Sequence, residues 1–291
     1  MRKRKKTEIA SVKSSGNVRL LGMLVSLGWL VLCPILVSAQ CKAKNDAFQS
    51  GEVLDYELFF NWKFIWIKAG TAQMTVSDNT YFDQQVYRTR LQAVTSKRLD
   101  KVFRMRDTLD CVYTKNLEPI YFRKGAEEGK RFTIDEAWFD YREGKCYVDQ
   151  KRAYRDGTFI QKRDTSEQCV FDMLSILAQA RSFDPTSYKK GERILFPMVT
   201  GKRVEEQILI YRGKEDFEAE NDTVYRCLVF SLVEMKGKKE KEVITFYITD
   251  DKNHLPVRLD LYLRFGSAKA FLKAASGLRN PQTSIVSKKG R

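Results

Sequence analysis

The stretch VYRTRLQAV, residues 86–94, alternates between two kinds of side chain. Its less polar side chains occupy every second position: Tyr87, Thr89, Leu91 and Ala93. Its strongly polar side chains fill the positions between them: Arg88, Arg90 and Gln92. Successive side chains of a strand point to opposite faces of a sheet, so the stretch predicts a strand with one buried and one solvated face.

Similar short apolar or alternating runs recur on both sides of this stretch. They lie at 54–60, 70–76, 103–113, 120–123, 132–141, 145–149, 194–199, 204–211, 225–233, 243–248, 257–265 and 268–274. Many short strands separated by turn signals are typical of antiparallel sheets. The sequence therefore predicts a mainly β protein built on a single large curved antiparallel sheet or partial β-barrel. We expect one such domain over residues 51–276, because no linker divides it.

One amphipathic α-helix is expected at about residues 167–182. Residues 164–167 offer N-cap candidates, and the Asp184-Pro185 pair stops a helix. Between them, apolar side chains and one arginine follow helical spacing: Phe171, Leu174, Leu177, Ala178 and Arg181. A lone helix in a β protein is expected to cover an open sheet edge or a barrel mouth.

The N-terminus has the pattern of a secretory signal peptide. Seven basic side chains precede an apolar run, residues 20–37, and small residues precede a cleavage position between Ala39 and Gln40. We therefore expect residues 1–39 to be a cleaved signal peptide and residues 40–50 to lead into the β domain, with no stable transmembrane span after cleavage. Two alternatives are a membrane anchor through residues 20–37 and lipidation of Cys41, although Gln40 stands where lipidation needs a small residue.

The net charge of +15 suggests a nucleic acid or an anionic surface as a partner. Removal of residues 1–39 takes away seven basic side chains and one acid, which leaves about +9. Charges of both signs are interspersed in the remainder, which is typical of a solvated surface, so we expect no nucleic-acid partner. Residues 277–291 are rich in basic side chains and are predicted to be a disordered tail.

The cysteines and the single histidine give no metal or cofactor motif. After cleavage five cysteines remain: Cys41, Cys111, Cys146, Cys169 and Cys227. Export permits disulfides, the odd count leaves at least one thiol unpaired, and the pairing stays open. Cys111 and Cys227 lie in apolar runs and are expected to be small core residues. His254 is the one histidine, so neither a metal site nor a histidine-based catalytic pair is predicted.

Two groups of residues are candidates for ligand binding. Arg88 and Arg90 share one face of their strand, and Arg104 and Arg106 have the same spacing, so pairing of the two strands would align four guanidinium groups. Such a set could hold an anion, or it could be a solvated face balanced by Asp83, Asp107 or Asp110. The second group is the aromatic bend with Trp62 and Trp66, which is either a binding lip or a buried hairpin plug.

No catalytic motif is present, and no catalytic residue is predicted. Acidic residues do cluster in the sequence, at Asp135, Glu136 and Asp140 and again at Asp250 and Asp251. Glycoside hydrolysis needs two carboxylates across a cleft, and sequence spacing does not establish such a pair on a β scaffold. A carboxylate-based hydrolase of cell-wall glycans therefore ranks third among the functional hypotheses.

Several short stretches, taken in order from about residue 49 to 275, resemble the DUF3108 family of exported bacterial proteins of unknown function. They are residues 51–56, 67–72, 103–107, 119–124, 139–140, 171–175, 188–192, 249–257 and 265–267. The resemblance implies an antiparallel β domain exported to the envelope, and the Gram-negative setting of the family implies the periplasm. It brings no catalytic residues to this chain.

The leading functional hypothesis is a periplasmic, non-enzymatic binding protein for an apolar or amphipathic envelope molecule, related to lipids or glycans. A large aromatic and aliphatic β domain without a catalytic signature supports it, because small curved barrels commonly contain such ligands. The alternative is a structural or assembly factor that contacts another envelope protein through a sheet edge or the basic C-terminal segment.

Overall fold

The computed structural model describes residues 41–62, 65–219, 223–237, 239–263 and 266–288. The predicted signal peptide and its cleavage residues Ala39 and Gln40 lie outside these ranges. In the part of the chain that the model describes, no helix is both long and apolar enough to span a membrane.

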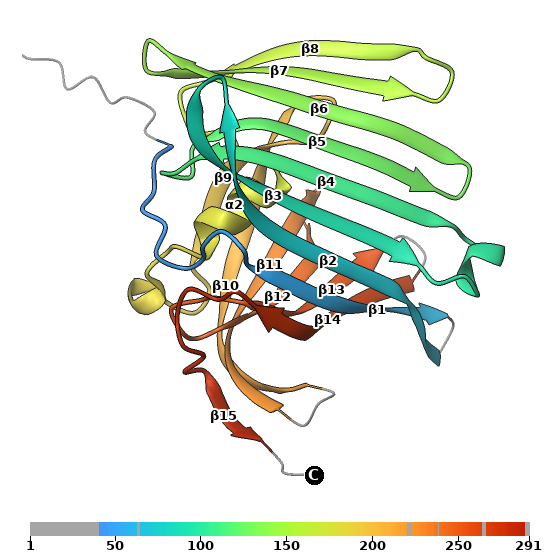
Figure 1. Ribbon diagram of the computed structural model, residues 1–291, viewed down its shortest axis with the longest axis vertical. Coiled ribbons are helices and arrows are strands. Elements are labelled where there is room, and N and C mark those ends of the chain that lie inside the picture. The colour runs from blue at the N-terminus through green and yellow to red at the C-terminus, as the bar shows by residue number, and fades with distance from the viewer. Residues whose placement is uncertain (1–40, 63–64, 220–222, 238, 264–265, 289–291) are drawn as a thin grey trace, which may run out of the picture. The chain divides into compact units, whose positions relative to one another are not determined.

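The described residues form one 15-stranded antiparallel sheet, so the predicted fold class is confirmed (Figure 1). Neighbours in the sheet follow the order β8-β7-β6-β5-β4-β3-β2-β1-β14-β13-β12-β11-β10-β9, and β15 pairs with β11. The strands are β1 Val53–Trp62, β2 Ile65–Tyr81, β3 Gln84–Thr95, β4 Met105–Thr114, β5 Pro119–Glu128, β6 Arg131–Arg142, β7 Lys145–Tyr154, β8 Phe159–Ser166, β9 Arg193–Val199, β10 Val204–Glu218, β11 Thr223–Lys236, β12 Lys239–Thr249, β13 Pro256–Leu263, β14 Gly266–Ser276 and β15 Ile285–Lys288.

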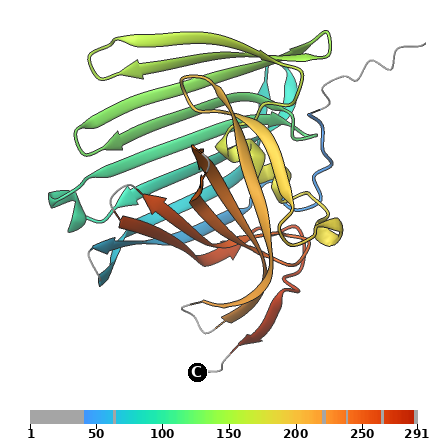
Figure 2. The same ribbon diagram turned by 180° about the vertical axis from the view of Figure 1, so that it is seen from behind.

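The sheet consists of two meanders joined at one seam. Strands β1–β8 pair in sequence order, strands β9–β14 do the same, and β1 pairs with β14 to join the two series. The sheet folds back on itself, so that β9–β13 cross behind the first series in Figure 1, and Figure 2 shows the same arrangement from behind.

Because the strands alternate in direction, their connections gather at two ends of the sheet. The end that we call the loop end carries the β1–β2, β3–β4, β5–β6, β7–β8, β9–β10, β11–β12 and β13–β14 connections. The other end, the helix end, carries residues 41–52, the only α-helix of the described chain, and residues 277–284. Most of the loop-end connections lie on the right-hand side of Figure 1.

The helix α2 spans Met173–Ala180 and is shorter than the predicted helix at 167–182. Its N-cap is Asp172, whose carboxylate accepts hydrogen bonds from the backbone N–H groups of Leu174 and Ser175. The predicted caps at 164–167 were wrong, because residues 159–166 pair with β7 as strand β8. This strand was missed because its side chains are mostly polar and exposed.

Two apolar clusters fill the inside of the fold. The first lies between β2, β4–β7 and α2: Val76, Leu109, Cys111, Tyr113, Phe122, Ala137, Phe139, Val148, Leu174 and Ala178 are among its members. The second lies where β1, β2, β13 and β14 meet β10 and β11, and includes Leu54, Tyr56, Met74, Phe217, Cys227, Val257 and Leu272. Together the clusters bury one side of α2 and one face of much of the sheet.

A buried ion pair ties α2 to the sheet. The Arg181 guanidinium donates hydrogen bonds of 2.6 and 2.9 Å to the Glu52 carboxylate and of 3.0 and 3.1 Å to the carbonyl oxygen of Asn253. The side chains of Arg181 and Glu52 are only 2% and 0% exposed. This pair therefore joins the end of α2, the residue before β1 and the β12–β13 loop.

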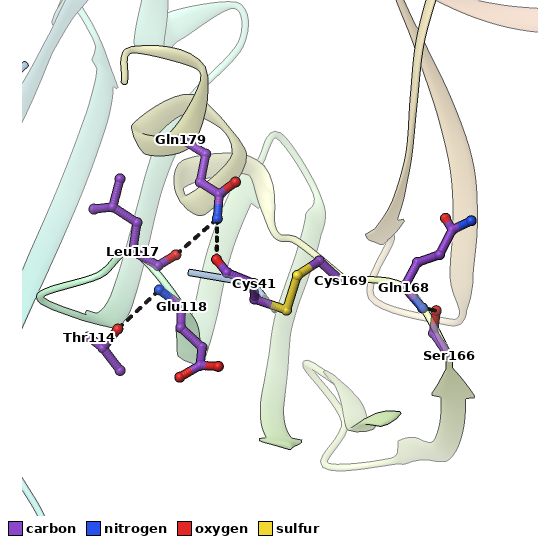
Figure 3. Close-up of a disulfide and its surroundings, with 8 residues drawn as sticks. All are labelled: Cys41, Thr114, Leu117, Glu118, Ser166, Gln168, Cys169 and Gln179. Carbon is purple, nitrogen blue, oxygen red and sulfur yellow. Dashed lines mark hydrogen bonds between the residues drawn. A yellow bond between two sulfur atoms is a disulfide. The ribbon is translucent and has the colours of Figure 1, made fainter. Parts of the chain in front are cut away.

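A disulfide between Cys41 and Cys169 attaches the N-terminal lead to the segment before α2 (Figure 3). The Gln179 side chain of α2 donates hydrogen bonds to the carbonyl oxygens of Cys41 (2.6 Å) and Leu117 (3.4 Å), which holds the lead against the β4–β5 turn. The remaining described cysteines, Cys111, Cys146 and Cys227, are buried thiols.

The C-terminal segment differs from the predicted disordered tail. Residues 285–288 form β15 and pair with the start of β11. The Arg279 guanidinium donates a hydrogen bond of 2.6 Å to the carbonyl oxygen of Asn45, and Leu278 packs against the second core cluster. The amino-acid composition of this segment predicted disorder because composition carries no information on contacts with distant parts of the chain.

Candidate binding site at the loop end

A basic cleft of about 480 Å³ opens at the loop end of the sheet. Four segments line it: the start of β6 with its preceding turn, the end of β7, the β7–β8 turn and the β9–β10 turn. The lining residues are Lys130, Arg131, Phe132, Thr133, Arg152, Tyr154, Arg155, Asp156 and Lys202. Five of the nine are cationic, so the cleft concentrates positive charge.

One wall of the cleft is held by the pair of Arg152 and Asp135. These side chains face each other across β6 and β7 with a bidentate contact, and Arg152 also donates a hydrogen bond of 3.1 Å to the carbonyl oxygen of Thr200. The hydrogen bond to Asp135 raises the pKa of Arg152, so its guanidinium stays charged. Because its charge is matched, Arg152 serves to dock the β9–β10 turn on the sheet.

Gly201 allows this docking. Its φ of +81° lies in the left-handed region, and a Cβ atom on it would lie 2.5 Å from both Nη2 of Arg152 and Cγ of Asp135. A side chain at this position would therefore displace the pair. Glycine places Lys202 next to β6 and β7, where it can contribute to the cleft.

The remaining cations of the cleft have few acidic partners. Lys130, Arg155 and Lys202 are exposed, and no carboxylate of the described chain forms an ion pair with them. Arg155 lies over the Phe132 ring, 5.4 Å from its centroid. The one acid in the lining, Asp156, accepts hydrogen bonds from Thr158, which lower the pKa of its carboxyl. The cleft can thus receive an anion beside aromatic surface.

A second hollow, of about 510 Å³, lies over β1, β2, β3 and β14. Both charged side chains of its lining already have partners: Asp55 accepts a hydrogen bond from Gln73 at 2.8 Å, and Lys273 pairs with Glu57 at 3.0 Å. Because both charged side chains of its lining are already bound, this hollow offers fewer free charges to a ligand than the basic cleft.

Strands β3 and β4 pair, and three of the four candidate arginines lie on one face of the sheet. Arg88 and Arg90 lie together and share the Asp110 carboxylate, at 2.9 and 2.8 Å. Burial tends to raise the pKa of Asp110, but its hydrogen bonds with the two arginines outweigh burial and lower it. The charge of this pair of arginines is therefore partly neutralised.

The other two arginines lie near the loop end, away from Arg88 and Arg90. Arg106 forms a bidentate ion pair with Asp100 in the β3–β4 connection. Arg104 precedes β4 and lies 3.7 Å from the Glu127 carboxylate. The structure therefore does not bring the four guanidinium groups into one site.

The aromatic bend does not form a buried plug at Trp66, which is 40% exposed and has the Lys269 ammonium over its ring at 4.7 Å. The side chain of Trp62 lies outside the part of the chain that the structure describes.

The acidic clusters do not form a catalytic pair. Asp135 is bound to Arg152, and Asp140 lies on the opposite face of β6. Asp250 lies at the helix end, where hydrogen bonds from Lys214 and Arg226 outweigh burial and lower its pKa. Among the described residues, no group of histidine, cysteine and acidic side chains could hold a metal ion. The hydrolase hypothesis therefore loses its structural support.

The remaining titratable groups of interest have structural contacts. Nδ1 of His254 lies 2.6 Å from the carbonyl oxygen of Arg181. The Cys111 thiol donates to the Asp172 carboxylate at 3.1 Å, and burial raises the pKa of that thiol. Cys111 and Cys227 are fully buried, as expected of core residues.

Sequence reasoning missed Lys130, Arg155 and Lys202. Each lies in a separate turn, more than twenty residues from the next. Pairing of β6 with β7 brings the turns of Lys130 and Arg155 together, and docking of the β9–β10 turn on these strands adds Lys202. The available signal was a basic residue within two positions of a glycine in each of these turns: Gly129-Lys130, Arg155-Asp156-Gly157 and Gly201-Lys202.

Comparisons with known proteins agree with the fold. The family model "Protein of unknown function (DUF3108)" matches residues 55–273. No curated protein is detectably similar in sequence. A crystal structure of a beta-barrel-like protein of the domain of unknown function DUF1849 from Brucella abortus is similar, with a TM-score of 0.51 and 10% identity, over 79% of this chain and 99% of that one. At this identity the likeness concerns the fold alone.

Proposed function

The chain belongs to the DUF3108 family of proteins of unknown function, and from that premise we propose that it is a periplasmic, non-enzymatic binding protein for an amphipathic envelope molecule. The observation that carries this proposal is the basic cleft, in which Lys130, Arg155 and Lys202 surround aromatic surface without an ion-pairing acid among the described residues. The ligand would place an anionic group, such as a phosphate or carboxylate, among these cations. Its apolar atoms would lie against Phe132 and Tyr154.

The disulfide supports the periplasmic part of the proposal. Disulfides persist in oxidising compartments and are rare in the cytosol. The Cys41 sulfur is bonded to Cys169 and is therefore not free to carry a thioether-linked lipid in the same molecule. This favours removal of residues 1–39 as a signal peptide over lipidation at Cys41.

Short-chain lipids that stay monomeric test the ligand class. We expect dihexanoyl-phosphatidylglycerol, which is anionic, to bind in isothermal titration calorimetry, and dihexanoyl-phosphatidylcholine to bind far more weakly. Replacing Lys130, Arg155 and Lys202 together with serine should weaken binding by up to about a hundredfold, because each ion pair with an exposed side chain contributes up to about 1 kcal/mol and tenfold corresponds to about 1.4 kcal/mol.

A matched control removes three exposed lysines from the helix end: Lys42→Ser, Lys189→Ser and Lys252→Ser. It lowers the net charge by the same amount and should leave binding unchanged. Equal weakening by both triple variants would contradict a specific site. Native mass spectrometry of the protein purified from its own periplasm gives a second test, since a reproducibly empty chain would contradict the proposal.

A second candidate function is strand addition by an envelope protein. Strand β8 ends the sheet and pairs only with β7 among the described strands, so one of its edges is free. The exposed Phe159 and Ile160 lie on this strand. Cross-linking from β8 that recovers one protein, together with no bound small molecule, would favour this function over ligand binding.

A further inference from the structure

The β3–β4 connection at the loop end combines basic and apolar side chains on its surface. Its sequence, SKRLDKVFR at residues 96–104, includes the short 3-10 helix Leu99–Lys101. Val102 is 77% exposed and Phe103 is 46% exposed. Both apolar side chains follow a run that contains Lys97, Arg98 and Lys101, which are also exposed.

This connection is fixed in place by hydrogen bonds at both ends. The Ser96 backbone N–H donates to Ala69 at 2.8 Å, and the Gly129 backbone N–H donates to Arg104 at 2.7 Å. In the middle, the Asp100 carboxylate binds Thr95 and Arg106. Val102 and Phe103 are therefore presented to solvent by an ordered segment.

Other exposed apolar side chains lie at the same end of the sheet. Ile65 and Ile67 begin β2 and are 68% and 36% exposed, and Leu263 ends β13 and is 47% exposed. The β1–β2 hairpin extends beyond the end of β3, since Thr95 pairs with Gly70. We call Ile65, Ile67, Lys97, Arg98, Lys101, Val102, Phe103 and Leu263 the docking rim.

The positive charges of the docking rim favour an anionic partner. Within the described residues, no carboxylate forms an ion pair with Lys97, Arg98 or Lys101, because the nearby Asp100 is bound to Arg106. Lysine is depleted from protein–protein interfaces. In contrast, lysine and arginine beside exposed apolar side chains match a bilayer surface, where cations meet anionic headgroups and apolar groups enter the acyl boundary.

We propose that the docking rim binds the surface of a bilayer that contains anionic lipids. Docking through the rim places the basic cleft next to the membrane. Arg104, at the end of the β3–β4 connection, accepts a hydrogen bond from the backbone N–H of Gly129, and the next residue, Lys130, lines the cleft. The proposal goes beyond ligand binding in the cleft, since the rim and cleft use different residues and can fail separately.

Hydrogen–deuterium exchange of the protein without its signal peptide, residues 1–39, in the presence of vesicles tests the proposal and locates the contact. The probes are vesicles of phosphatidylethanolamine and phosphatidylglycerol (3:1) and vesicles of phosphatidylcholine alone. We expect peptides covering residues 65–68 and 96–104 to gain protection with the anionic vesicles only, and peptides at the helix end to stay unchanged.

Two variants separate the charged and apolar contributions in vesicle sedimentation. Replacing Lys97, Arg98 and Lys101 with serine should lower partitioning through the rim by about a hundredfold and remove its salt dependence, since each basic residue near an anionic surface contributes about fivefold. Replacing Val102 and Phe103 with serine should lower partitioning about tenfold and retain the salt dependence.

Two matched controls lie at the helix end. The first is the variant with Lys42, Lys189 and Lys252 replaced by serine, and the second is Phe82→Ser, since Phe82 is 90% exposed and lies in the β2–β3 turn. Both should leave partitioning unchanged. The proposal is overturned if the rim peptides gain no protection on anionic vesicles, or if the control variants lower partitioning as much as the rim variants. If the protein docks on vesicles but binds no monomeric lipid, only the cleft proposal is overturned.

Discussion

Substitution of Glu52 by glutamine tests how far the buried ion pair holds the helix on the sheet. The change keeps the shape of the side chain and removes its charge, so Arg181, which is only 2% exposed, loses its anionic partner and keeps only neutral oxygens, those of the new amide and of the Asn253 carbonyl, as acceptors. Removing one member of a buried pair costs about 3–5 kcal/mol, because the other charge is left without compensation. Domains have free energies of unfolding of about 5–15 kcal/mol, so a loss of this size would be easily measured.

Urea unfolding at pH 7, followed by circular dichroism, measures the effect through the transition midpoint at constant slope. The matched control is Asp149→Asn, whose ion pair with Arg163 lies at the surface with side chains 47% and 59% exposed. Such surface pairs contribute little, so we expect no resolvable change.

A double variant separates the cost of an unpaired charge from the loss of an attraction. Glu52→Leu combined with Arg181→Met removes both charges and should lose less stability than Glu52→Gln alone, because no buried charge remains. The reasoning would be refuted by a loss below about 1 kcal/mol for Glu52→Gln, which is below the range expected for an unpaired buried charge. It would equally be refuted by a double variant less stable than the single one.

Three further predictions concern other contacts. Replacing Cys41 and Cys169 with serine should lower the free energy of unfolding by about 5 kcal/mol, the chain-entropy value for residues 128 apart, whereas a reductant should destabilise only the parent protein. Burial raises the pKa of the Asp107 carboxyl to about 6 in the folded state. Between about pH 4 and 6 this carboxyl is therefore protonated in the folded state and ionised in the unfolded state, so the stability of the protein falls as the pH rises through this range. Asp107→Asn should therefore stabilise the protein at pH 7 by about 1 kcal/mol after allowance for solvent screening, and flatten the pH dependence measured by thermal unfolding. Gly201→Ala should cost about 1–2 kcal/mol for its left-handed backbone and weaken dihexanoyl-phosphatidylglycerol binding, because its Cβ atom would displace Arg152.

The strands could be predicted because the alternation of apolar and polar residues in the sequence follows the alternation of buried and exposed side chains along a strand. Residues 86–94 lie within β3, and Thr89 and Ala93 point to the inner face as their spacing predicts. Strand β8 was not predictable in this way, since it lies at the edge of the sheet and has no face with consistently buried side chains.

The start of α2 was misplaced for a related reason. Residues 164–167 have capping side chains, but tertiary pairing with β7 holds residues 159–166 as a strand, and Asp172 caps the helix instead. The basic cleft was beyond sequence reasoning, because the turns that carry Arg155 and Lys202 meet only through the contact between Arg152 and Thr200.

The seam between β1 and β14 has a consequence for the order in which the chain folds. Every other pairing along the main sheet order, from β8 to β9, joins strands that follow each other in sequence, whereas Val53 and Ser276 pair across about 220 residues. Closing so long a loop costs entropy that no local contact repays, so the two meanders can form well before they join. Until β14 has been synthesised, β1 keeps an unpaired edge that could recruit a strand from another chain. Residues 266–276 thus determine when the growing protein stops being vulnerable to aggregation through this edge.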